Sequence, residues 1–286
     1  MIATITPRRR RVDRAVTILS LVAVLLALAP LTWILIDVIR TGIGAIHGAS
    51  FFTQAPPGDP SSTAGGIANG ILGTLIILGV AILIAVPIGI LGAIYLVEFA
   101  PKSRFAFFVR FFADVMSGVP SIVFGIFVYA LIVATTKHYS AFAGSIALAL
   151  IMWPIILRST EEILKLVPED LRLAAHALGA PRWRTTLQVV LPAAAGGILT
   201  GAMLGVARAA GETAPLLFTA LGNQFVSARL DKPISALPLE IFRGALTVFE
   251  QANQRAWAAA LTLIMFVLAL SLGGRILVAR RERALR

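Results

Sequence analysis

The chain has 286 residues, of which 58% are hydrophobic and only 14% charged, and its mean hydropathy is +0.89. A soluble domain of this length needs far more polar surface to cover its core, so the composition excludes that class. The chain contains no cysteine, which excludes disulfides and thiolate metal sites. Its formal net charge of +11 is compatible with nucleic-acid binding until the positions of the charges are considered.

Several apolar runs reach the length of about 20 residues that crosses a bilayer as a helix, which predicts an all-α membrane protein. A basic segment, 1–14, precedes the first run, which is too long for the apolar region of a signal peptide and is therefore expected to stay uncleaved. In the third run, Gly118-Val119-Pro120 also fits an interfacial helix that leads into a shorter span. The six predicted spans are 15–38, 69–97, 106–134, 144–160, 193–217 and 256–278.

The distribution of basic residues predicts the orientation of these spans. Eighteen of the 25 lysines and arginines fall on the side of the two termini, six fall on the opposite side, and Arg208 lies within a span. By the positive-inside rule both termini, including the basic segment 279–286, are expected to be cytoplasmic. This topology explains the basicity without nucleic acid.

Two long segments are then expected outside the membrane. The first, 39–68, is rich in Gly, Pro and Ser and is predicted to be a mobile loop. The second, 218–255, contains the amphipathic stretch LPLEIF (237–242), which is expected either to lie flat on the outer surface or to contact a partner. The core of the protein is therefore expected within 69–278.

The cytoplasmic loop 161–192 contains a polar stretch, LAAHALGAPRWRTTLQVVLP (173–192), that interrupts the apolar pattern. Two alanines allow close approach on a first helix, a glycine ends that helix, and a proline starts a second one. Three apolar residues recur on the second helix at spacings of four and three. The pattern predicts a short helix–turn–helix projection built by Ala174, Ala175, Gly179, Pro181, Trp183, Leu187 and Val190.

This stretch resembles the cytoplasmic loop of the permeases of ABC importers, whose pattern is Glu-Ala-Ala, three residues, Gly, nine residues, Ile, any residue and Leu-Pro. Leu173 takes the place of the glutamate, which puts one polar contact in doubt. In that family the loop forms coupling helices that dock in a groove of an ATP-hydrolysing subunit, so the resemblance implies such a partner. The alternative is an ordinary loop with a chance match. The matching positions are Ala174, Ala175, Gly179, Val189 (in place of Ile), Leu191 and Pro192.

The fifth predicted span contains two ionisable residues, Arg208 and Glu212, which are four apart and are expected on one helix face. An ionisable residue within the bilayer costs at least about 2.5–3.5 kcal/mol, so the pair is expected to face a partner or a wet cavity. At 1.5 Å per residue, Arg208 lies roughly 24 Å beyond Pro192, in the outer half of the membrane. Two interpretations stay open: a structural ion pair, or an anion pathway in which Arg208 supplies positive charge, Glu212 orients or gates it, and Thr213 donates a hydroxyl.

Longer stretches around this pair sharpen the resemblance. ARAAGETAPLLFTALGNQF (207–225) and VRFFADVMSGVPSIVFGIFVY (109–129) resemble the PstA family of permease subunits of phosphate importers, and the likeness covers about 69–278. The resemblance implies the type I ABC importer permease fold and inward transport of inorganic phosphate across the bacterial cytoplasmic membrane. It also implies a sister permease of the PstC type, a homodimeric ATPase of the PstB type that binds ATP and Mg²⁺, and an extracytoplasmic phosphate-binding protein of the PstS type.

No catalytic or metal site is expected in this chain. It has neither a GxxxxGK[ST] phosphate loop nor a Gly-x-Ser-x-Gly motif, so we expect no ATP binding in the usual way and no enzyme activity. The three histidines are scattered over different loops. Near the cytoplasmic side, Arg110 and Asp114 are four apart and are expected to pair with each other, while Arg158 is expected to anchor the end of the fourth span or to line a gate.

Rival functions remain at this point. A permease for another oxyanion, such as molybdate or sulfate, differs from the favoured function only in its substrate. An ion-driven secondary transporter predicts paired interrupted helices or an inverted repeat, and neither is evident. A purely structural membrane anchor leaves Arg208 and Glu212 unexplained.

Overall fold

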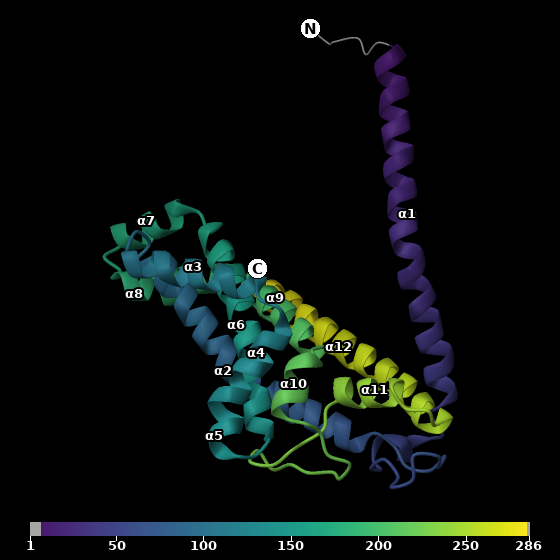
Figure 1. The fold of residues 1–286 in the computed structure, drawn as a ribbon. Helices are drawn as coiled ribbons and strands as arrows, with labels where there is room; N and C mark the ends of the chain where they lie inside the picture. Colours follow the sequence, from purple (N-terminus) through teal and green to yellow (C-terminus); the bar gives the residue numbers. More distant parts are fainter. Residues whose placement is uncertain (1–6, 285–286) are drawn as a thin grey trace.

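A computed structural model describes residues 7–284, and within them the chain is built of helices and connecting loops (Figure 1). In this described part, regular structure other than helix is limited to one isolated parallel bridge between Leu221 and Ile234. The long apolar runs form helices because a helix satisfies all its peptide groups internally where water is absent.

Among the described residues, five helices are long and apolar enough to cross a membrane, and one bent pair supplies a sixth span. This confirms the predicted all-α fold with six spans. The spanning helices are α1 (Pro7–Gly44), α2 (Ala68–Ile94), the pair α3 (Arg104–Gly118) and α4 (Ser121–Val128), α6 (Ala141–Lys165), α9 (Leu191–Ala210) and α12 (Glu250–Ala284). The shorter elements are η1 (Ala49–Phe52), η2 (Tyr95–Phe99), η3 (Tyr129–Val133), α5 (Ala134–Thr136), α7 (Glu169–Ala177), α8 (Arg182–Thr185), η4 (Thr186–Val190), α10 (Ala214–Thr219) and α11 (Leu237–Ala245).

The third span is sharply bent. The helical axis turns by 107° between α3 and the segment that begins at Ser121. Val119 and Pro120 at the turn are extended, because the proline lacks an N–H and disfavours helix in the residue before it. The alternative of two helices joined at Gly118-Val119-Pro120 is therefore the one that the chain adopts.

Helix α6 forms the centre of the bundle, where it packs against α2, α9, α3, α4 and α10. Ile156 of α6 is fully buried and fits between two glycines of its neighbours. A Cβ at Gly89 of α2 would lie 2.8 Å from Ile156 Cγ2, and one at Gly205 of α9 would lie 3.1 Å from its Cγ1. Small residues thus let three helices approach closely, as is typical of packing in membranes.

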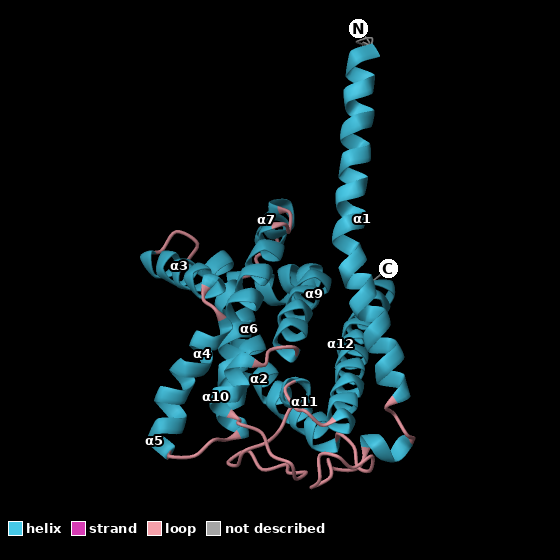
Figure 2. Ribbon diagram, turned by 45° about the vertical axis from the view of Figure 1, so that its right-hand side comes forward, coloured by secondary structure: helices cyan, strands magenta, loops and turns pink. Residues whose placement is uncertain are grey.

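Helix α1 stands apart from this bundle. None of its most apolar 18-residue window is buried, whereas 67% of the corresponding window of α6 is buried. Figure 1 shows α1 meeting α12 only near its C-terminal end, where a Cβ at Gly42 would lie 2.9 Å from Leu261 Cβ. The start of α1 and the end of α12 lie on the same side as α7, and the long loops gather on the other (Figure 2).

The two long segments that the sequence predicts on the outer side both contact the helices. In the loop after α1, which is predicted to be mobile, the Arg255 guanidinium of α12 donates to the carbonyl oxygens of Ser62 at 2.5 Å and Pro60 at 3.0 Å. The amphipathic stretch forms α11, whose Leu237 and Leu239 are buried while the helix packs against α2 and α12. Both segments therefore complete the core of this chain on its outer side.

Candidate translocation and coupling sites

The projection that the sequence predicts on the cytoplasmic side consists of α7 and α8 joined by a tight turn. Gly179 has a φ of +81°, a left-handed conformation that favours glycine, and it follows the end of α7. Pro181 is extended and precedes the first residue of α8. Leu191 and Pro192 are the first two residues of α9.

The second helix of the projection differs from the prediction. It is not a separate element, because α8 continues through the π-helical turn η4 into α9 as one run from Arg182 to Ala210. Pro192 has no N–H to bond the preceding turn, and the π-helical turn just before it accommodates the missing bond. The projection is therefore a direct extension of the fifth span, so a displacement of α8 acts on α9 along one helix.

The projection exposes apolar side chains. Leu178 is 90% exposed, and Leu173, Trp183 and Leu187 are each more than half exposed. The Arg184 guanidinium lies over the Trp183 ring, 5.5 Å from its centroid. Exposed apolar groups beyond the membrane mark a contact surface for another protein.

Two predicted members of this surface lie elsewhere. Val190 is fully buried against the bundle, so the predicted face of Trp183, Leu187 and Val190 is divided between the surface and the core. Of the two adjacent alanines, Ala175 is buried and Ala174 is exposed. Ala175 thus seats α7, and Ala174 belongs to the outer surface.

A charge cluster at the cytoplasmic end of α6 went unrecognised in the sequence. Glu161 is fully buried and accepts bonds from Arg110 Nε at 2.6 Å and Arg158 Nη1 at 2.6 Å, and Lys165 Nζ lies 3.0 Å from it. Arg158 Nε also lies 2.9 Å from Asp114 Oδ1. The predicted Arg110–Asp114 pair is therefore wrong: Arg110 compensates the buried carboxylate of Glu161, and Asp114 pairs with Arg158 instead. Arg158 bridges α3 and α6.

The pair in the fifth span also differs from the prediction. Arg208 lies in the last turn of α9, which ends at Ala210, and Glu212 lies beyond Gly211 in the break before α10. Glycine lowers helix propensity and Pro215 follows closely, so the helix does not continue through the pair. Arg208 Nε is 3.9 Å from Glu212 Oε1, a loose contact rather than a hydrogen-bonded bridge.

The Arg208 side chain faces away from the packed bundle. It is 52% exposed, whereas Glu212 is 17% exposed. Thr200 and Leu204, which precede it at helical spacing, are exposed on the same side of α9. A cavity of about 550 Å³ lies along the turns of α9 before Arg208 and includes Thr200, Leu204 and Arg275 in its lining. Thr213 directly precedes α10 and is half-buried.

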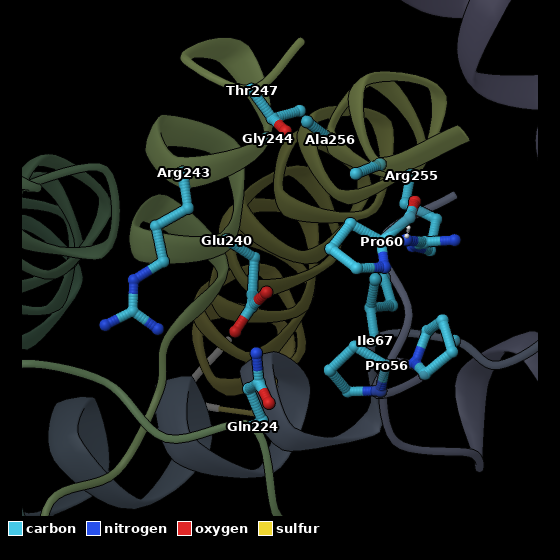
Figure 3. Close-up of a pocket in the computed structure, with 13 residues that line it drawn as sticks. Pro56, Pro60, Ile67, Gln224, Glu240, Arg243, Gly244, Thr247, Arg255 and Ala256 are labelled. Atoms are coloured by element: carbon cyan, nitrogen blue, oxygen red, sulfur yellow. Dashed lines mark hydrogen bonds between the residues drawn. The ribbon is translucent and has the colours of Figure 1, made fainter. Parts of the chain in front are cut away.

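An outer cavity of about 170 Å³ lies between α11, the start of α12 and the loop after α1 (Figure 3). Glu240, Arg243 and Arg255 contribute charge to its lining, and Arg243 donates to the carbonyl oxygen of Leu221. Glu240 accepts hydrogen bonds from Asn69 Nδ2 at 2.9 Å and from the Ser235 hydroxyl. Arg255 holds the loop through the carbonyls described above. These groups chiefly bind the protein itself, so the cavity is a structural junction.

Comparison with known proteins agrees with this architecture. The family described as "Binding-protein-dependent transport system inner membrane component" matches residues 85–286. The phosphate transport system permease protein PstA of Yersinia pestis is 44% identical over 274 residues, 96% of this chain and 92% of that protein. PstA of Haemophilus influenzae is 43% identical over 264 residues (92% and 93%), and PstA 1 of Mycobacterium tuberculosis is 40% identical over 288 residues (98% and 92%).

Among solved structures, a chain of the inward-facing MetNI methionine ABC transporter matches with a TM-score of 0.60 at 17% identity, covering 76% of this chain and 94% of that one. The fold is thus that of the membrane subunit of a binding-protein-dependent ABC importer, a multi-pass permease rather than an ATPase. Importers of this class work with an ATPase and a substrate-binding protein. The chain belongs to the PstA family, which confirms the resemblance drawn from its sequence.

Proposed function

We propose that this chain is a transmembrane permease subunit of an ATP-driven importer that moves inorganic phosphate into the cell. The observation that carries the proposal is Arg208, a permanently charged side chain that lies in an apolar span and is half exposed on the unpacked side of α9. Such a group cannot face lipid without a large cost, so this side faces an aqueous path or a second permease subunit. The phosphate name of the relatives supports phosphate as the substrate.

The role of each site residue follows from its place. Arg208 offers a delocalised cation that attracts an oxyanion and can bind two of its oxygens. Glu212, loosely held at 3.9 Å and mostly buried, limits how strongly Arg208 retains the anion, because a conducting site must release what it binds. Thr213 places a hydroxyl in the break between α9 and α10. The break lets this short segment change conformation separately from the rigid α9.

Energy enters from the cytoplasmic side through the coupling loop. An ATPase docks on the apolar surface of the projection, which consists of Leu173, Ala174, Leu178, Trp183 and Leu187. Because α8 continues into α9, movement of the projection displaces the helix that carries Arg208. The two-state element that coupling requires is therefore the rigid unit of α8, η4 and α9.

The complete transporter has further subunits. We propose a sister permease of the PstC type beside α9, a homodimeric ATPase of the PstB type that holds ATP and Mg²⁺, and a phosphate-binding protein of the PstS type at the outer loops. This chain supplies no ATP site and catalyses no reaction. Its location is the bacterial cytoplasmic membrane, with α7 and both chain ends inside.

The rival functions predict different behaviour. Another oxyanion importer would share the architecture, but the relatives with more than 40% identity given above carry the phosphate name. A secondary transporter has no use for an apolar cytosolic projection. The names of the related permeases favour phosphate as the substrate, and the projection favours ATP as the energy source.

The test is phosphate uptake by the purified complex in proteoliposomes that contain ATP. We expect uptake that requires both ATP and the binding protein, survives a proton uncoupler, and is not inhibited by molybdate or sulfate. Uptake that continues without the ATPase and stops when the proton gradient is dissipated would favour the secondary transporter.

A further inference from the structure

One arginine of the projection joins it to the membrane helices. Arg172 of α7 is 11% exposed, and Glu98 in the π-helical turn η2, which continues α2, is 10% exposed. Arg172 Nη2 lies 2.8 Å from Glu98 Oε1, and Arg172 Nε donates to Oε2 at 3.4 Å. The neighbouring carboxylate raises the pKa of the Arg172 guanidinium above its ordinary value.

The same guanidinium holds the end of α6. Its Nη1 donates to the carbonyl oxygen of Val167 at 2.7 Å, and its Nη2 donates to that of Leu164 at 3.0 Å. The last carbonyls of a helix have no partner within the helix and favour a cation. One side chain of α7 therefore binds the cytoplasmic ends of two spans, α2 and α6, which pack against each other through the bundle.

The rest of this contact is open rather than closely packed. A cavity of about 690 Å³ lies between α7, α8 and the ends of α2 and α6, with Glu98, Lys165, Arg172 and His176 among its lining residues. The buried apolar contribution of α7 is the methyl group of Ala175. Force on α7 therefore reaches α2 mainly through the bonds of Arg172.

We propose that the Arg172–Glu98 pair is the link that makes α2 move with the coupling loop, and that Arg172 is a positioning residue for transport. The inference rests on the proposed function, because only a docked ATPase would drive α7. Without Glu98, the guanidinium would keep only the exposed carboxylate of Glu169 at 3.4 Å and two backbone carbonyls as partners, which is unfavourable for a largely enclosed charge. The pair consequently persists while the elements around it move as one unit.

The test uses the complete transporter in proteoliposomes and measures ATP hydrolysis and phosphate uptake together. The variants are Glu98→Gln, Arg172→Gln and the double variant. We expect hydrolysis to continue and the phosphate taken up per ATP to fall roughly 5-fold or more in each single variant. The double variant should be no worse than the poorer single variant, because both substitutions remove the same link.

Glu169→Gln is the matched control. Glu169 also contacts Arg172, at 3.4 Å, but its side chain is 71% exposed. Losing an exposed contact should leave uptake per ATP within about twofold of the natural protein.

Three outcomes would overturn the inference: coupling within twofold of the natural protein, additive losses, or hydrolysis that falls in proportion to uptake. The last would mean that the pair serves folding or docking. Glu98→Gln retains the carbonyl contacts of Arg172, so it remains a test if Arg172→Gln does not assemble. If instead the natural complex hydrolyses ATP and takes up no phosphate, the proposed function itself fails.

A covalent replacement separates linkage from stability. Because the chain has no cysteine, Glu98→Cys and Arg172→Cys together give two unique thiols that a short bifunctional reagent can bridge, with cysteine-free partner subunits. We expect the unbridged variant to be uncoupled and the bridged one to regain most of its uptake per ATP. A bridge that is confirmed by mass and restores nothing would contradict the link.

Discussion

Glu161 and Arg110 are 51 residues apart in the chain, yet the carboxylate oxygen of one accepts a bond from Nε of the other at 2.6 Å. Arg110 also donates from Nη2 to the carbonyl oxygen of Leu96 at 2.9 Å. This arginine therefore ties α3 to α6 and to the end of α2 at the cytoplasmic boundary. The helix that precedes the bend, α3, is thus held in place by the contacts of a charged side chain.

Replacing Glu161 by Gln should destabilise the protein severely. Three cations, Arg110, Arg158 and Lys165, would lose their common carboxylate, and breaking a buried ion pair costs about 3–5 kcal/mol. Thermal unfolding of the assembled transporter in detergent measures the effect. Glu162→Gln is the control, because Glu162 is 63% exposed and its bridge to Lys165 is worth about 0–1 kcal/mol. Equal melting temperatures for the two variants would contradict the role of Glu161.

Arg208→Gln should preserve assembly and lower phosphate uptake by about tenfold or more, a change of at least ~1.4 kcal/mol in the barrier. The reason is that the amide keeps much of the shape but removes the charge that attracts the anion. Arg208→Lys keeps the charge and should retain more uptake. Arg229→Gln, at a surface arginine paired with Asp231, should transport normally. Normal uptake by Arg208→Gln would reduce the residue to a structural role.

Gly73→Ala should disrupt the outer end of α2. A Cβ at Gly73 would fall 1.7 Å from the carbonyl oxygen of Ser235, which forces the backbones apart and costs about 1–3 kcal/mol or more. Gly79→Ala on the same helix meets nothing within 4 Å and should be neutral or stabilising by up to about 1 kcal/mol. Melting temperatures of the two variants, compared in one detergent, decide the matter. A stable Gly73→Ala protein would show that the two segments are farther apart.

Trp183→Ala and Leu178→Ala should weaken co-purification of the ATPase without lowering the melting temperature of the permease. Both side chains are exposed, so they contribute little to folding, while buried anchors dominate binding between proteins. Leu246→Ala is the control, because Leu246 is 70% exposed on the outer side, beyond reach of a cytosolic partner. Unchanged co-purification of both projection variants would place the ATPase elsewhere.

The number of spans could be predicted because bilayer thickness sets the length of apolar runs. Their orientation stays a prediction from the basic residues, which mark one side. The ion pairs could not be predicted, because a spacing of four identifies a partner only within one helix. Arg110 pairs with Glu161 on another span, and Arg172 of the projection pairs with Glu98 in η2, at the end of α2. Gly211 and Pro215 are residues that favour a helix break between Arg208 and Glu212. They lie within a long apolar run, however, and that run favours one uninterrupted helix. Which side of α9 is exposed depends on how the whole bundle packs, so it could not be predicted from the sequence.

The contact between α1 and α12 has a consequence for biosynthesis. Gly42 and Leu261 meet near one end of α1, yet they are 219 residues apart (261 − 42) in a chain of 286. At about 5–20 residues per second, the ribosome needs roughly 10–40 s to make that interval. Throughout this time α12, the helix that α1 contacts, has not yet been made. The retention of α1 in the bilayer therefore depends on surrounding lipid or insertion factors. The contact between α1 and α12 can therefore form only after most of the chain has been made.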